Sequence, residues 1–292
     1  MSEPLPYIVR IRDYYLALGY AEPYRWARFD DVPFTPFRVP IEEATIAVVT
    51  TAAPFKSGAG EQGPGAPYNG RAKFFEVYSG ESDVEPDLRI SHIAIDRDHT
   101  SADDQGSYFP LRAFQTLVAD GELGALAHRF HGLPTDRSQR NTLEKYAPEI
   151  VRRCRQDEAD GVVLVPNCPV CHQSVSLVAR VLEESGIPTV ILGCARDIVE
   201  YVGVPRLLFN DFPLGNAAGR PHDPDSQTQV AREALALLAD ADQARTTRQS
   251  SLRWSDDDRW KRDYSNAALL SREEIARRRE EFDRAKRDAK AV

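Results

Sequence analysis

The sequence predicts an α/β fold in which helices cover both faces of a parallel sheet. Short apolar runs at 161–166, 189–193 and 206–210 alternate with longer segments whose apolar residues recur at helical spacing. Strands that are apolar on both faces are typical of parallel sheets buried between two helical layers. Right-handed crossovers would join such strands. We therefore expect a Rossmann-like or flavodoxin-like sheet.

Each remaining element follows from a local pattern in the chain. A helix is expected within 5–20, where Ile8, Ile11 and Leu18 recur at helical spacing, and prolines then exclude a helix as far as residue 40. The other expected strands are at 45–50 and in the apolar run at 88–96, and a loop rich in glycine and proline is expected at 51–73. Helices are expected from Pro110, at 141–156, at 173–185, and in the segment that carries Val230, Ala234, Leu237 and Leu238.

Composition divides the chain into three segments. Residues 1–40 form an N-terminal helix and a proline-rich connector, 41–245 an α/β core, and 246–292 a charged helical tail. The core can be read as two lobes, about 41–155 and 156–245. In the tail, Ser271 and Glu274 have the spacing of a capping box at the start of a final helix. The thin apolar stripe of that helix makes a homodimer or other homo-oligomer our expectation.

Charge and composition exclude several classes of function. The 292 residues carry a formal net charge of −8, which argues against nucleic acid or anionic membranes as partners. No apolar stretch approaches the length of a membrane span, and the first residues lack the pattern of a signal peptide. We therefore expect a cytoplasmic protein, where four cysteines are poor candidates for structural disulfides.

The most informative motif is Cys168-Pro-Val-Cys171-His172, which follows the apolar run at 161–166 directly. It places two thiols where a parallel strand ends and a helix begins. Backbone amides and the helix dipole stabilise an anion there, so a thiol at this position ionises more easily. The sequence thus predicts a nucleophile or a metal ligand at Cys168 and Cys171, with His172 tuning the thiols, contacting substrate or capping the helix.

Two metal interpretations of this motif remain as alternatives. Cys194 follows the 189–193 strand, so Cys168, Cys171 and Cys194 could together hold zinc at one edge of the sheet. The motif also matches the covalent haem attachment pattern, which would require an oxidising compartment. With no second Cys-x-x-Cys pair in the chain, we favour redox chemistry without a metal.

Other strand ends deliver further candidates to the same edge. The run at 88–96 brings His92 and Asp96, a pairing suited to general acid–base catalysis. Arg71, after the glycine-rich loop, could bind a substrate carboxylate. Thr51 and Phe212, which follow the strands at 45–50 and 206–210, are expected to contact substrate at the rim of the same crevice.

The stretches ADGVVLVPNCPVCHQSVSLVARVLEESGIPTV and FNDFPLGNAAGRPHDPDSQ resemble the selenoprotein B family of glycine, sarcosine and betaine reductases. The likeness is greater to the D-proline reductase subunit and its cysteine-containing relatives, and it covers roughly residues 30–240. In that family the first position of the motif is often selenocysteine. The resemblance implies that Cys168 is the nucleophile of a reductive C–N or C–X cleavage, that Cys171 resolves the adduct, and that His92 and Asp96 belong to the site.

The sequence thus favours an oxidoreductase that acts on a small polar substrate. It needs no cofactor of its own, because an external dithiol or a thioredoxin-type protein would reduce the Cys168–Cys171 disulfide. The alternatives are a zinc-binding α/β protein, a cofactor-independent racemase or lyase with two thiols, and a subunit whose thiols report redox state.

Overall fold

The computed structural model describes residues 3–290, and within the last helix it leaves out the side chains of 285 and 288–290. Residues 1–2 of the predicted N-terminal segment and 291–292 of the predicted tail lie outside this range. The strands are β1 (Thr45–Thr50), β2 (Ala53–Pro54), β3 (Tyr78–Glu81), β4 (Leu88–Arg89), β5 (Ala125–Leu126), β6 (Arg129–Gly132), β7 (Gly161–Val165), β8 (Thr189–Gly193), β9 (Arg206–Phe209) and β10 (Thr246–Gln249).

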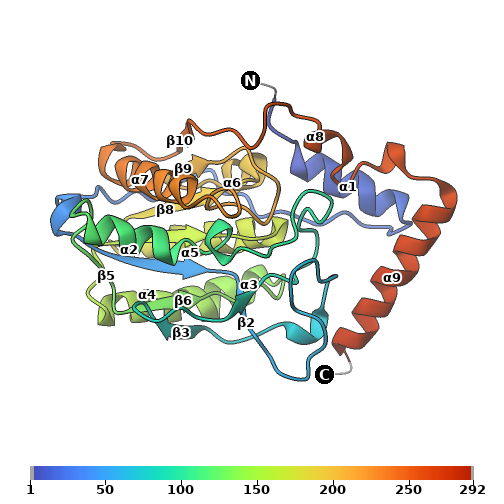
Figure 1. Ribbon diagram of the computed structural model, residues 1–292, viewed down its shortest axis with the longest axis horizontal. Helices are drawn as coiled ribbons and strands as arrows, with labels where there is room; N and C mark the ends of the chain where they lie inside the picture. Colours follow the sequence, from blue (N-terminus) through green and yellow to red (C-terminus); the bar gives the residue numbers. More distant parts are fainter. Residues whose placement is uncertain (1–2, 291–292) are drawn as a thin grey trace.

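Eight of these strands form one sheet in the order β10-β9-β8-β7-β1-β6-β3, with β5 also paired to β1 (Figure 1). All pairs are parallel except that of β3 with β6. Strands β2 and β4 make a separate antiparallel pair. The predicted parallel α/β sheet is therefore confirmed, with one antiparallel strand added at its edge.

Helices cover both faces of this sheet. The α-helices are α1 (Tyr7–Ala17), α2 (Leu111–Ala119), α3 (Gln139–Asn141), α4 (Ala147–Gln156), α5 (Pro169–Glu184), α6 (Arg196–Val202), α7 (Pro224–Asp240), α8 (Trp260–Asp263) and α9 (Arg272–Lys290). A π-helical turn, η4 (Thr142–Tyr146), leads into α4, and short 3-10 turns are η1 (Ile41–Glu43), η2 (Gly70–Ala72), η3 (Gln105–Ser107) and η5 (Ala267–Leu269). In Figure 1, α1, α8 and α9 gather beyond one end of the sheet.

The two faces of the sheet have separate apolar cores. On β1, Ile46 and Val48 belong to the core that includes residues of α2 and α7, whereas Ala47 and Val49 belong to the core that includes residues of α4, α5 and α6. Successive side chains of a strand point to opposite faces, so both sets must be apolar. This is why the strands read as unbroken apolar runs in the sequence.

The chain reverses its direction across the sheet at β1. It pairs β6 on one side of β1 and then returns to place β7 on the other side. Such a reversal opens a crevice between the carboxyl ends of β1 and β7, and ligands of open α/β sheets bind in crevices of this kind. The backbone amide of Thr51 donates to the Val165 carbonyl (3.2 Å), and the amide of Asn167 donates to the Thr51 hydroxyl (3.0 Å). These bonds fix the segment that leads into Cys168.

Two expectations about the elements need correction. The run at 88–96 forms only β4, outside the main sheet, because Ile90 and Ile95 pack near Gly215 and the Asp96 amide donates to the Leu214 carbonyl (2.9 Å). The first residues of the predicted tail form β10, paired with β9, so the sheet extends past residue 245. The sheet also runs through both expected lobes of the core.

The final helix begins as its capping box predicts, since the Glu274 amide donates to the Ser271 hydroxyl (3.2 Å). Its residues Arg279 and Asp283 then contact Tyr20, which fastens α9 beside α1. Within residues 3–290, no helix has the length and apolar character needed to span a bilayer.

Candidate functional site

The Cys-x-x-Cys motif occupies the carboxyl end of β7 and the first turn of α5. Cys168 is the N-cap of α5, and its sulfur accepts a hydrogen bond from the Cys171 amide (3.2 Å). The two cysteines form a disulfide, and their side chains are buried. The sulfur of Cys168 therefore lies where helix amides stabilise negative charge, as a thiolate leaving group or nucleophile requires.

His172 ties this turn to the next strand end. Its Nδ1 lies 2.8 Å from the Cys168 carbonyl, and its Nε2 accepts from the amides of Cys194 (3.0 Å) and Ala195 (3.2 Å). Nδ1 must therefore carry the proton, and the ring is neutral. Burial lowers the pKa of His172 to about 4, which agrees with this state. His172 thus holds the first turn of α5, which carries the disulfide, against the end of β8.

A small cavity of about 30 Å³ opens in front of Cys168. This is room for about one or two waters. Its lining comes from the glycine-rich loop, the segment around His92, the segment after β6 and the motif itself: Ala53, Tyr68, Asn69, Ala72, Lys73, Phe74, Ser91, His92, Ile93, Thr135, Arg137, Cys168 and Val170. No acidic residue is among them.

His92 shares this cavity with Cys168. Its Nδ1 is buried and has no hydrogen-bond partner among the described residues. Burial lowers the pKa of His92 to about 4, and the nearby cations Lys73 and Arg97 add to this effect, while the Thr51 carbonyl opposes it. At neutral pH His92 is therefore an uncharged imidazole whose vacant Nδ1 can accept a hydrogen bond.

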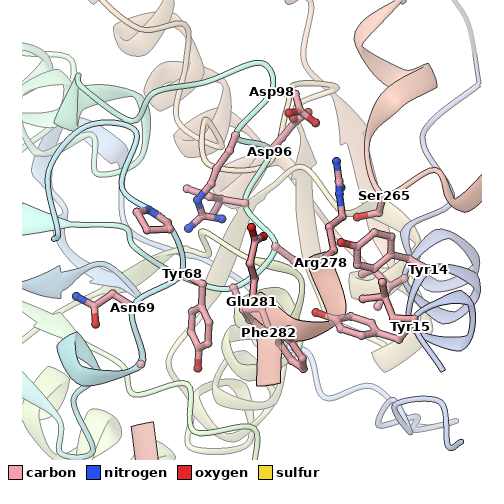
Figure 2. A pocket seen from close by; sticks show the side chains of 18 of the residues that line it. Tyr14, Tyr15, Tyr68, Asn69, Asp96, Asp98, Ser265, Arg278, Glu281 and Phe282 are labelled. Carbon is pink, nitrogen blue, oxygen red and sulfur yellow. The ribbon is translucent and has the colours of Figure 1, made fainter. Parts of the chain in front are cut away.

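Asp96 and Arg71 lie elsewhere, around a larger pocket of about 690 Å³ next to the first. In Figure 2, Tyr15, Tyr68 and Phe282 lie along one side of this pocket, and Asp96 and Asp98 lie on the opposite side. The carboxylate of Asp96 is paired with Nδ1 of His99 (2.9 Å) and not with His92. Burial raises the pKa of Asp96.

The larger pocket is separated from the cavity at Cys168 by residues that line both. These shared residues are Tyr68, Asn69 and Ile93. Arg71 is exposed, and its guanidinium donates to the Gly58 carbonyl (3.4 Å). The structure therefore places His92 with Cys168, and places Asp96 and Arg71 on the far side of a shared wall.

Cys194, Thr51 and Phe212 occupy the same edge of the sheet but are buried side chains. Burial raises the pKa of the Cys194 thiol, and the Asp211 carboxylate adds to the effect. Phe212 packs against Trp254 (5.7 Å between ring centroids) and, like Cys194 and Thr51, is absent from the lining of the Cys168 cavity. Among the described residues, no group of three or more histidine, cysteine or acidic side chains is arranged to hold a metal ion.

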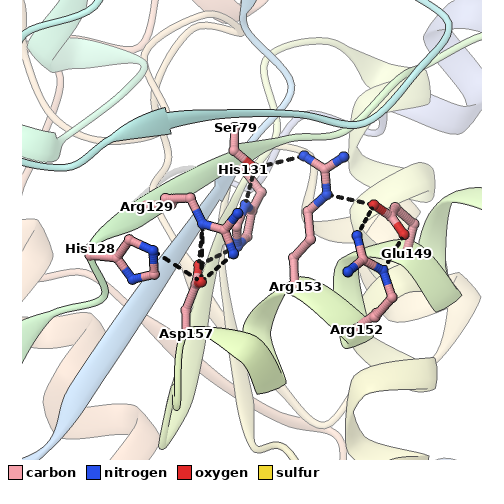
Figure 3. Close-up of polar contacts among 8 residues, drawn as sticks. All are labelled: Ser79, His128, Arg129, His131, Glu149, Arg152, Arg153 and Asp157. Atoms are coloured by element: carbon pink, nitrogen blue, oxygen red, sulfur yellow. Dashed lines mark hydrogen bonds and ion pairs between the residues drawn. The ribbon is translucent and has the colours of Figure 1, made fainter.

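A second polar cluster escaped the sequence analysis because its members are far apart in the chain. Ser79 on β3, His131 on β6 and Asp157 after α4 lie in a row that two arginines flank (Figure 3). Ser79 Oγ lies 2.8 Å from Nδ1 of His131, and Nε2 of His131 lies 3.1 Å from the Asp157 carboxylate. Arg153 donates to Ser79 Oγ (2.6 Å), and Arg129 binds Asp157. We call these five residues the Ser79 network.

Comparison with known proteins gives three relevant relatives. The chain is 30% identical over 211 residues to the D-proline reductase subunit gamma of Acetoanaerobium sticklandii, an alignment that covers 71% of this chain and 83% of the relative. It is 25% identical over 225 residues to the glycine reductase complex component B subunit gamma of Symbiobacterium thermophilum, with 75% of this chain and 51% of the relative covered.

The third relative, the corresponding subunit from Peptoclostridium acidaminophilum, is 23% identical over 140 residues, with 47% of this chain and 32% of the relative covered. The chain thus spans about half or less of the two glycine reductase subunits. No family model and no solved structure matches it. From the first relative, and from the motif geometry described above, we conclude that this chain belongs to the selenoprotein B family of reductase subunits, together with the gamma subunit of D-proline reductase.

Proposed function

We propose that this chain is the thiol-bearing subunit of a reductase, with Cys168 as nucleophile and Cys171 as resolving thiol. The observation that carries the proposal is the Cys168–Cys171 disulfide at the N-terminus of α5, facing a cavity that His92 also lines. Of the two thiols, Cys168 lines this cavity, whereas Cys171 is buried behind it. This asymmetry supports Cys168 as the attacking thiol.

The proposed reaction is a two-electron reductive cleavage of a C–N or C–X bond in a small polar substrate. The Cys168 thiolate attacks the substrate carbon, so that a C–S bond forms and the C–N or C–X bond breaks with release of the amine or X. Cys171 then attacks the Cys168 sulfur, the C–S bond breaks with its electron pair on carbon, which takes up a proton, and a disulfide forms. The two thiols supply two electrons and two protons, one proton to the carbon and one to the leaving group. His92 is neutral, and its vacant Nδ1 accepts a hydrogen bond from the thiol or from the substrate. An external dithiol or thioredoxin-type protein reduces the disulfide for the next cycle.

The relatives suggest which substrates to test first. Their names mention D-proline and glycine, and each is called a subunit, so we extend to this chain a small amino acid as substrate and a further protein subunit as partner. The experiment therefore uses the full chain together with any proteins that copurify with it, reduced beforehand and freed of excess reductant.

A trapping experiment tests the roles of the two thiols. In the Cys171→Ser variant, we expect a substrate adduct to accumulate on Cys168, measured by mass spectrometry of the intact protein and its peptides. The Cys168→Ser variant should form no adduct, and the wild type should lose two thiols per substrate consumed. Full turnover by Cys168→Ser would refute the assignment. Turnover without loss of thiols would instead favour a racemase or lyase with two thiols.

A further inference from the structure

The cavity in front of Cys168 carries more positive charge than its neighbours neutralise. Lys73 and Arg137 both line it, and neither forms an ion pair with a carboxylate among the described residues. Instead, each lies over an aromatic ring, Lys73 over Tyr68 (5.6 Å from the nitrogen to the ring centroid) and Arg137 over Tyr24 (5.8 Å from Cζ to the ring centroid). Cations held against ring faces, with no acidic partner, remain available to an incoming anion.

The backbone at Arg137 supports a positioning role for its side chain. Arg137 has a φ of 70°, in the left-handed region that residues other than glycine rarely adopt. Such strain persists where the surroundings enforce it, and it is concentrated at ligand-binding positions. Here it occurs on a residue that lines the Cys168 cavity.

The route into the cavity is positively charged as well. A groove of about 380 Å³ lies beside it and shares the wall residues Ile93, Arg137 and Val170. Among the described residues, the charged side chains that line this groove are four basic ones and one acidic one: Arg12, Arg25, Arg137, Lys286 and Glu22. Of the basic ones, Arg12 is paired with Asp13 (2.9 Å). Since a cleft of one sign concentrates ions of the other, anions are drawn toward Cys168 along this path.

We propose that Lys73 and Arg137 form an anion-binding rim at Cys168, and that the substrate presents a compact anionic group to this rim while its reacting atom meets the sulfur. The inference rests on the proposed function, because it uses Cys168 as nucleophile. Lys73 and Arg137 are then the residues that select for substrate charge. The groove lined by Tyr24 and Trp26 holds the remainder of the substrate.

Two alkylating reagents of nearly equal size test this rim. Iodoacetate is anionic and iodoacetamide is neutral. The rate of labelling of Cys168 by iodoacetate divided by the rate with iodoacetamide therefore reports the local charge. The reduced, folded chain is treated with each reagent, and labelling of Cys168 is followed by peptide mass spectrometry. The same peptide in urea-unfolded chain gives the reference ratio. We expect the folded ratio to exceed the unfolded one by about tenfold and to fall as salt is added.

Variants assign the effect to the two cations. Lys73→Gln and Arg137→Gln should each lower the folded ratio about threefold or more, whereas Lys73→Arg should preserve it. Lys56→Gln, at an exposed lysine of the same loop, and Arg140→Gln, at an exposed arginine near Arg137, are the matched controls and should leave the ratio unchanged. A folded ratio equal to the unfolded one, or one insensitive to both Gln variants, would overturn the proposal.

The same measurements separate failure of the rim from failure of the proposed function. The pH dependence of iodoacetamide labelling gives the pKa of the Cys168 thiol, and a value at or above about 8.5, that of a free cysteine, would count against an activated nucleophile. That result would leave the charge ratio interpretable. Conversely, an acidic thiol with no charge selectivity would retain the nucleophile and reject the rim. Absence of labelling by both reagents would contradict both.

Discussion

Two groups of polar side chains, each with a histidine and two cationic neighbours, use their hydrogen-bonding capacity in opposite ways. The Ser79 network contains a serine, a histidine and an aspartate in a row, which is the set of a nucleophilic triad. Yet Arg153 binds the serine oxygen that would have to attack, so its guanidinium occupies the approach of an electrophile. Each of the five side chains has a hydrogen-bond or ion-pair partner within the network, although Nε2 of His131 faces the Asp157 carboxylate at 3.1 Å without the geometry of a hydrogen bond.

The Cys168 site is the reverse case. Nδ1 of His92 lacks a partner, and Lys73 and Arg137 lack a carboxylate among the described residues. Unmet bonding capacity around a cavity is what a ligand can satisfy, whereas side chains that pair with one another stabilise the fold. The comparison teaches that residue type does not mark a functional site here. What marks the site is the set of polar groups without partners around the cavity beside the Cys168 sulfur.

The largest expected effect on stability comes from the loss of the hydrogen bonds that His172 makes next to the disulfide. His172→Phe leaves the Cys168 carbonyl and the Cys194 and Ala195 amides without their buried partner. We expect the free energy of unfolding to fall by about 3 kcal/mol or more, measured by urea denaturation with the disulfide intact. His172→Gln, which retains a donor and an acceptor, is the control and should lose less. Equal losses in the two variants would show that ring volume, not hydrogen bonding, is what matters.

Acid should weaken both regions through their buried histidines. Burial lowers the pKa of His172 and of His131 to about 4. At His131 the Asp157 carboxylate opposes the effect of burial, and Arg129 and Arg153 add to it. The unfolded chain takes up these protons first, near pH 6.5, so the folded state loses stability as pH falls from about 6.5 to about 4. We expect a loss of about 2 kcal/mol for each histidine between pH 7.5 and pH 5, obtained from the urea midpoints at these two pH values.

The pH test has its own control within the comparison. His131→Gln and His172→Gln should each reduce the acid-dependent loss of stability, because each removes one group that titrates only after unfolding. If neither variant changes the difference between pH 7.5 and pH 5, the acid sensitivity arises from other groups, and the neutral state assigned to these rings is wrong.

The smallest effect is expected from the serine of the Ser79 network. Ser79→Ala removes a hydrogen bond to His131 and one from Arg153, so it should cost about 1 kcal/mol of stability. It should not change adduct formation at Cys168, and a fluorophosphonate probe should leave Ser79 unlabelled. Ser57→Ala, at an exposed serine, is the control for stability. Probe labelling of Ser79 would mean that the network is a second active site.

Much of the fold could be read from local patterns. The strands at 45–50 and 189–193 have the predicted bounds, and β7, β9 and α7 follow their apolar patterns closely. The run at 88–96 was misread because its isoleucines are buried against a loop, and burial in a loop gives the same apolar pattern as burial in a strand. Strand β10 was missed because its sequence, TTRQ, is polar and lies at the sheet edge.

The candidate site divides in the same manner. The placement of Cys168 at a helix start depends on adjacent residues only, so the sequence predicts it directly. The partner of Asp96 could not be predicted, because the choice between His92 and His99 depends on how the segment from 90 to 100 turns in space. Lys73 and Arg137 carry no local signal, since each is one basic residue in an irregular segment.

By itself, the amino-acid sequence determined the alternation of strands and helices, the family, and the thiol pair at the end of β7, because periodicity and motif spacing are properties of neighbouring residues. Only the tertiary structure decided which side chains meet around the sulfur of Cys168. The physical reason is that the crevice forms where β1 and β7 lie side by side, and the other walls of the cavity come from segments between Ala53 and Arg137, which are roughly 30 to 115 residues away from Cys168 along the chain.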